Sequence, residues 1–351
     1  MTIKSLAHSA QKHLQATSSS PIKRAHVYEL IAAAFGFGSY AALNATAIFA
    51  DLPDPPSRDS IDPSSIQRRA IELGYDFSMA ERISTELADF LASRDICAIR
   101  IHKLLDKLRD EWGARDLLTS PVLLESLEAS ANRNIADAHY ALALIYGPDE
   151  YEDNKTGVSD YWYNQGQQGR VLTGVEIEWA DAYTQHLANE RKYVTHLREA
   201  ARLGNQLALI DTADQFDDPT FFEQTTQEVD VDPSEVARIA QRMGRDNDAR
   251  TWLTRAAECG NIEAMRELIE HYDSDNLLQC WTWIYLAQLR GTDLTRDDYH
   301  AINEDGSPYD DDVGGPLYAD GTDGLELSPL PADRDQAARI AAKTLFSRIP
   351  D

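Results

Sequence analysis

Four glycines divide the middle and end of the chain into segments of similar design. They are Gly169, Gly204, Gly260 and Gly291. A bulky side chain lies eight residues before each glycine, and in three of the four segments alanine lies four residues before it. The bulky residues are Tyr161, His196, Trp252 and Trp283. This order of large residue, small residue and helix-ending glycine predicts a closely packed helix before each glycine.

A second pattern follows the anchors. Residues four, eight and twelve positions after Gly204, Gly260 and the glycine-like Asn134 are mostly small, then apolar, then aromatic. These residues are Ala208, Thr212 and Phe216; Ala264, Leu268 and Tyr272; and Ala138, Leu142 and Tyr146. The anchors at 134, 169 and 204 are 35 residues apart, and an insertion lengthens the next step to 56. A period near 35 with two helices per unit is typical of an α-solenoid.

Two of these segments carry a family resemblance. Trp252–Tyr272 (WLTRAAECGNIEAMRELIEHY) and His196–Phe216 (HLREAARLGNQLALIDTADQF) resemble the Sel-one-like repeat, a relative of the tetratricopeptide repeat. Asn134–Tyr146 is similar to the first helix of another unit, with Lys155–Gly169 as a degenerate second helix. The unit that follows Gly169 departs from the pattern, since Thr173 and Asp181 stand where alanine and an aromatic are expected.

The resemblance covers roughly residues 120–291. It implies an α/α superhelical solenoid of Sel-one-like, tetratricopeptide-type helix pairs, used as a scaffold for protein–protein contacts and common among bacterial signalling and secretion-associated proteins. We therefore expect an all-α protein with a small N-terminal helical module.

The motifs divide the chain into six expected parts. These are an N-terminal helical module at 1–50, a proline-rich linker at 51–65, a helical bridge at 66–133, the repeat solenoid at 134–291, an acidic loop at 292–332 and a capping helix at 333–351. Apolar bridge residues such as Ile96, Ile99 and Leu104 recur at helical spacing up to Trp112, and no stretch shows the alternation of a half-buried strand. We therefore predict no strand.

The charge balance narrows the class of partner. The chain has 59 acidic and 33 basic side chains, for a formal net charge of −26. Such a surface repels phosphate backbones, which disfavours nucleic acid, and it favours a basic protein or peptide. Three widely spaced cysteines without C-x-x-C spacing fit a reducing compartment and indicate buried thiols.

Residues 30–50 form an uncharged stretch, so a transmembrane helix and a signal peptide are alternatives to a soluble segment. The stretch is rich in alanine and is interrupted by Gly36, Gly38 and Asn44, and more than 20 largely polar residues precede it. We expect two short helices joined around Gly36, with Ser39 capping the second. No membrane span or export signal is then expected, and the protein is expected to be cytoplasmic.

The N-terminal module leaves a second functional class open. Pro21–Ala45 resembles a small helical module found in some bacterial proteins, and its helix–turn–helix arrangement on a local charge of +3 permits a DNA-associated regulator using residues 21–47. The second expected helix, however, carries no arginine or asparagine in its first turn to read bases. We expect a docking or dimerising role instead.

No catalytic residue, cofactor or metal ligand is predicted, because the chain lacks dinucleotide, P-loop, zinc-protease and serine-hydrolase motifs. An all-α enzyme stays open as an alternative if Glu176, Glu178, Asp181 and His186 converge in a pocket. Cation binding also stays open near residues 310–321, which match a calcium loop that lacks its final bidentate carboxylate.

The candidate partner-binding residues are aromatics and histidines on the repeat helices and two phenylalanines in an acidic insertion. They are His139, Tyr161, Trp162, Trp179, Phe221, Phe222 and His271. At helical spacing the aromatics can equally belong to the core. The leading prediction is a non-enzymatic interaction scaffold or adaptor that binds a basic protein or peptide, and the oligomeric state is left open.

Overall fold

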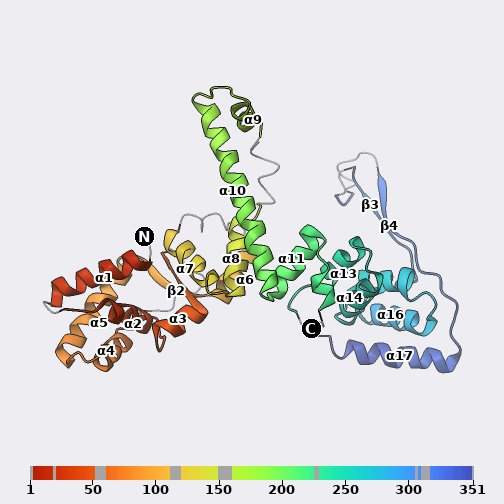
Figure 1. Cartoon of the computed structure of the whole chain (residues 1–351). Helices are drawn as coiled ribbons and strands as arrows, with labels where there is room; N and C mark the ends of the chain where they lie inside the picture. Colours follow the sequence, from red (N-terminus) through yellow and green to blue (C-terminus); the bar gives the residue numbers. More distant parts are fainter. Residues whose placement is uncertain are drawn as a thin grey trace. The chain divides into compact units, whose positions relative to one another are not determined.

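The computed structural model describes residues 3–18, 21–51, 61–110, 120–148, 160–224, 229–304, 307–309 and 317–349. The chain forms two compact units, Met1–Asp218 (unit 1) and Pro219–Asp351 (unit 2). Helices make up most of the described part of each unit, as predicted (Figure 1). The division falls inside the expected 134–291 array rather than at the expected 51–65 linker.

Unit 1 opens with five helices around one core. They are α1 (Ile3–Ser18), α2 (Arg24–Ala34), α3 (Tyr40–Thr46), α4 (Pro63–Glu72) and α5 (Phe77–Ala92). Leu6, Leu30, Ile66 and Leu87 from four of these helices belong to the same buried cluster. The expected N-terminal module is therefore continuous with helices that follow the expected linker. The Ser39 hydroxyl accepts a hydrogen bond from the Ala42 amide, which confirms the predicted cap of the second short helix.

A two-stranded antiparallel sheet corrects the prediction of no strand. β1 (Ala47–Asp51) pairs with β2 (Ile96–Arg100), where apolar spacing had indicated helix. Both faces of the sheet are buried: Phe49 and Ile96 belong to the first core cluster, and Ile48 and Ile99 belong to the second. A strand buried on both faces has no polar side to alternate with, so its sequence resembles a buried helix segment.

The rest of unit 1 is helical. It comprises α6 (Ile101–Asp110), α7 (Pro121–Ala131), α8 (Ala136–Tyr146), α9 (Tyr161–Gln167), α10 (Val175–Arg202) and α11 (Gln206–Phe216). Between Gly169 and Gly204 the 35-residue period had predicted a helix pair, but α10 is one helix of 28 residues. Its sequence contains neither glycine nor proline, so nothing local ends it before Leu203.

Unit 2 is built from helices and one hairpin. It comprises α12 (Thr220–Glu223), α13 (Pro233–Arg242), α14 (Asp246–Glu258), α15 (Ile262–Glu267) with a continuing π-helical turn η2 (Leu268–Tyr272), α16 (Leu277–Leu289), strands β3 (Asp298–Ile302) and β4 (Tyr318–Thr322), and α17 (Ala332–Phe346). The hairpin β3–β4 lies in the expected acidic loop, and α17 is the predicted C-terminal helix. Residues 310–316 of the calcium-loop hypothesis lie outside the described residues.

The helix-ending anchors adopt the backbone conformation that the sequence predicts. Asn134, Gly169, Gly204, Gly260 and Gly291 all have positive φ, between 61° and 98°. Of the three thiols, Cys97 and Cys280 are buried as expected, whereas Cys259 is exposed. Among the described helices, none combines the length and apolarity that a membrane span needs.

Candidate functional site: the α9–α10 hairpin

Only part of the long helix α10 is packed into unit 1. Its 28 residues extend for about 42 Å. Its buried residues are Ala180, Leu197 and Ala200, so the N-terminal half contributes a single alanine to a buried position. That half packs against the short helix α9, and the two form a hairpin joined by residues 168–174 (Figure 1).

Aromatic rings line this hairpin. The ring of Tyr161 meets Trp162 edge-on at 5.0 Å, and Trp162 lies 6.2 Å from Trp179 on α10. The guanidinium of Arg170 covers one face of Trp162 at 4.7 Å. Tyr161 and Trp179 nevertheless keep about half of their surface exposed, 50% and 51%. The structure thus brings together three of the seven predicted binding residues.

Aliphatic residues that the sequence prediction missed extend the patch. Val171, Val175 and Ile177 are 84%, 50% and 45% exposed, in the connecting loop and the first turn of α10. With Tyr161, Trp162 and Trp179 they form what we call the hairpin surface. In the sequence, residues 171–179 (VLTGVEIEW) contain several apolar side chains between acidic ones. A solvent-exposed loop and helix start do not need such apolar residues, and this is the pattern that could have predicted the surface. Val175 and Trp179, four residues apart, lie on the same face of α10, and exposed apolar side chains gathered in this way mark interaction sites more often than isolated ones do.

Acidic residues outnumber basic ones in the segment that carries the hairpin surface, up to Arg191 and Lys192 on α10. Residues 160–190 contain five acids and one base, Arg170, for a net charge of 1 − 5 = −4. The five acids are Asp160, Glu176, Glu178, Asp181 and Glu190. Arg170 is engaged by Glu176 at 2.7 Å, so the remaining carboxylates dominate the local field. Glu178, Asp181 and His186 are exposed to solvent, so the carboxylates do not enclose a pocket as the enzyme alternative requires.

His139 contacts a second histidine on α10. Its Nδ1 lies 3.0 Å from Nδ1 of His196, and its Nε2 lies 3.1 Å from the Ala131 carbonyl oxygen. Burial lowers the pKa of both histidines, that of His196 to about 4, where His139 and Lys192 act in the same direction. The two residues are 57 positions apart, and their pairing joins α8 to α10. His139 therefore helps to hold two helices together and is partly buried.

The remaining predicted residues lie in unit 2 and do not join the hairpin surface. Phe221 and Phe222 are buried, at 3% and 9% exposure, which corrects their assignment as a recognition loop. Phe221 packs on Trp252 at 5.8 Å, and Arg245 covers the ring of Phe222 at 5.3 Å. His271 is exposed, with Glu270 4.0 Å away.

Three comparisons with known proteins gave no match. A scan against protein-family models matched none, and searches of curated proteins and of solved structures gave no match either. Within the described residues, no group of three or more His, Cys, Asp or Glu side chains could hold a metal ion.

Proposed function

We propose that this protein is a non-enzymatic interaction scaffold whose hairpin surface docks a basic amphipathic helix of a partner protein. The observation that carries the proposal is the exposure of Tyr161, Trp179 and three aliphatic side chains within residues 160–190, a segment with a net charge of −4. Apolar contact would supply most of the affinity, at about 25 cal/mol per Å² buried. The carboxylates would select lysine and arginine at the edges of the partner helix.

Charge also distinguishes between possible occupants of the surface. A second copy of this chain would bring another net charge of −4 against the first, and like charges at an interface oppose association. Nucleic acid is repelled in the same way. A helix with one apolar face and flanking basic residues satisfies both features of the hairpin surface, and helix-in-groove docking is a common mode of recognition.

We further propose that the helices flanking this hairpin are Sel-one-like repeats of a solenoid. The positive-φ anchors at Asn134, Gly204 and Gly260 support this reading, because each ends one helix and starts the next with the same geometry. Asn205 and Asn261 follow the last two anchors, and both cap their helices from the side chain.

The alternative of a DNA-associated regulator that uses residues 21–47 receives less support. Helix α3, the reading helix of a DNA-associated regulator, exposes Ala41, Ala42 and Ala45, which offer bases no hydrogen-bonding groups, and its exposed Thr46 hydroxyl donates to the Ala42 carbonyl oxygen. Arg24 on α2 is engaged with His8 at 2.7 Å.

The test uses an 18-residue fluorescein-labelled amphipathic helix of leucine and lysine, titrated with the full chain. Trp179→Ala should weaken binding about tenfold, because one large aromatic anchor is worth on the order of 1.4 kcal/mol or more. Phe77→Ala is the matched control, because Phe77 is a 67% exposed aromatic in the same unit but away from the hairpin. Glu178→Gln with Asp181→Asn should also weaken binding and reduce its salt dependence.

Two outcomes would contradict the proposal. Equal binding of a leucine–glutamate peptide would show that charge does not select the partner. Equal weakening by Phe77→Ala would show that the peptide adheres to the acidic surface in general. Self-association that Trp179→Ala abolishes, measured by sedimentation, would replace the basic helix by a second copy of the chain.

A further inference from the structure

A groove in unit 2 runs along α14 and is closed by α16 and α17. One part has a volume of about 770 Å³ and is lined by residues of all three helices. A second part, of about 440 Å³, shares Arg255, Glu258 and Leu345 with the first and continues toward Arg348. Volumes of this size are typical of ligand sites.

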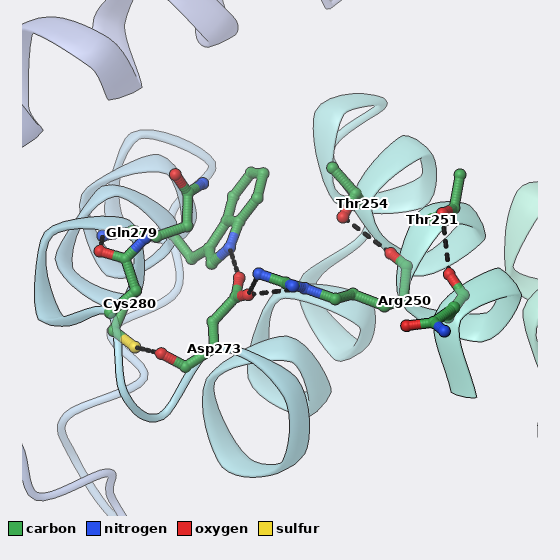
Figure 2. Close-up of polar contacts among 9 residues, drawn as sticks. Arg250, Thr251, Thr254, Asp273, Gln279 and Cys280 are labelled. Carbon is green, nitrogen blue, oxygen red and sulfur yellow. Dashed lines mark hydrogen bonds and ion pairs between the residues drawn. The ribbon is translucent and has the colours of Figure 1, made fainter.

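A buried carboxylate fixes one arginine in the groove. Asp273 is 3% exposed, and one of its oxygens accepts hydrogen bonds from Nε and Nη2 of Arg250 at 3.1 and 2.6 Å (Figure 2). Its other oxygen accepts from Nε1 of Trp283 at 3.0 Å. The Arg250 guanidinium is therefore held in one orientation. Its Nη1 has no acceptor among the described residues, which leaves donors for a ligand.

Two further arginines make the groove basic. Arg255 stacks over the ring of Trp252 at 4.4 Å, and it forms no ion pair within the described residues. Arg348 lines the second part of the groove and likewise pairs with no described carboxylate. Against these three arginines stand Glu258 and the fully engaged Asp273, so the lining has a net charge of 3 − 2 = +1. On a chain of net charge −26, such a groove is a local exception.

The walls of the groove carry polar groups suited to a peptide backbone. The hydroxyls of Thr251, Thr254 and Thr344 each donate to a carbonyl of their own helix, at 2.7 to 2.9 Å. Each hydroxyl oxygen keeps acceptor capacity for a ligand N–H. The side-chain amide of Gln279, which also lines the groove, can both donate and accept.

We propose that this groove binds an extended peptide segment that carries acidic side chains. Arg250 and Arg255 are five residues apart on α14 and both line the first part of the groove, so their guanidiniums offer two separate contacts. Carboxylates are the side chains that guanidiniums bind through charge-assisted hydrogen bonds. The inference is independent of the hairpin surface, which lies in the other unit and selects the opposite charge.

The probe is a fluorescein-labelled, C-terminally amidated nonapeptide with Glu-Ala-Glu at its centre, titrated with the full chain and followed by anisotropy. Saturable binding is expected, and Arg255→Gln should weaken it about tenfold, since a charge-assisted hydrogen bond is worth on the order of 1.5 kcal/mol or more. Arg296→Gln is the matched control, because Arg296 lies in the same unit with an 83% exposed side chain outside the groove. Arg250→Gln should also weaken binding, with its folding checked by circular dichroism because Asp273 loses its partner.

Each alternative result would overturn the inference. Equal binding of the Gln-Ala-Gln peptide would remove the role of the carboxylates, and unchanged binding by Arg255→Gln would place the peptide elsewhere. Displacement by inorganic phosphate at the concentration of the peptide would assign the groove to a small anion.

Discussion

At the residue scale, the contact between His139 and His196 depends on protonation. Two Nδ1 atoms at 3.0 Å need one donor and one acceptor, so at least one ring must be neutral at that nitrogen. Burial favours this state, because it lowers the pKa of His196 to about 4 from the ordinary 6.5. The contact therefore holds only while at least one of the two rings is neutral, and burial disfavours protonation of His196.

The sign of the pH effect follows from this lowered pKa. Below pH 6.5 the unfolded chain binds a proton at His196 that the folded chain refuses until about pH 4, so the free energy of unfolding of unit 1 falls across this window. At about pH 5 we expect a loss of about 1 kcal/mol, which allows for the partial exposure of the ring. In urea unfolding at neutral and acidic pH, His196→Gln should remove this loss. The exposed His271→Gln should retain it, and an unchanged pH dependence in His196→Gln would contradict the assignment.

Asp273 illustrates the cost of losing a buried charge partner. Asp273→Ala leaves the Arg250 guanidinium and the Trp283 indole N–H without their acceptor. Since Arg250 is half-exposed, we expect unit 2 to lose about 2–3 kcal/mol of stability, near the lower limit for such pairs. Urea unfolding followed by tryptophan fluorescence measures this loss. The neighbouring Asp275 is exposed, so Asp275→Ala should change the midpoint little. Equal effects of the two substitutions would refute the argument.

At the scale of elements, helix ends follow local rules while helix length and strand formation do not. The positive-φ anchors end helices because glycine and asparagine tolerate that conformation. The continuity of α10 across the expected helix break, and the conversion of 96–100 into β2, depend instead on what packs around them. The hairpin surface exists because α10 continues beyond the core of unit 1.

Gly204 provides a test of the anchor argument. Its φ is +89° and no atom would contact an added Cβ, so Gly204→Ala should cost backbone strain alone, about 1 kcal/mol. The thermal midpoint of unit 1 should fall accordingly. Gly38→Ala is the matched control, because Gly38 also has open space but lies outside the positive-φ region. A shift of the same size in both variants would mean that loss of glycine, rather than left-handed geometry, sets the cost.

At the scale of the whole molecule, the chain has two compact units, and we propose a binding surface of opposite charge preference on each. Unit 1 presents the acidic hairpin surface, and unit 2 contains the basic groove. Together the two proposals predict that the chain binds a basic helix and an acidic segment at the same time. Net charge alone, at −26, would have indicated basic partners for the whole chain.

The division between the units leads to a prediction about fragments. Residues 1–218 and 219–351, produced separately, should each fold, because each has its own buried core, with Leu30 and Leu142 in the first and Trp283 and Leu268 in the second. Their far-ultraviolet circular dichroism spectra should sum to that of the full chain, and each should melt cooperatively. A fragment without a cooperative transition would show that its unit depends on the other.

The sequence by itself determined the helical class, the helix ends at Asn134, Gly204 and Gly260, the Ser39 cap and the aromatic candidates of α9. These features follow from local backbone preferences and from spacing along one helix, so no knowledge of distant segments is needed. The tertiary structure alone decided that 96–100 pairs as a strand with 47–51, that His139 meets His196, that Phe221 is core and that Arg250 is fixed by Asp273. Each of these depends on a partner far along the chain, and burial on both faces or pairing across 23 to 57 residues leaves no periodic signal in the sequence.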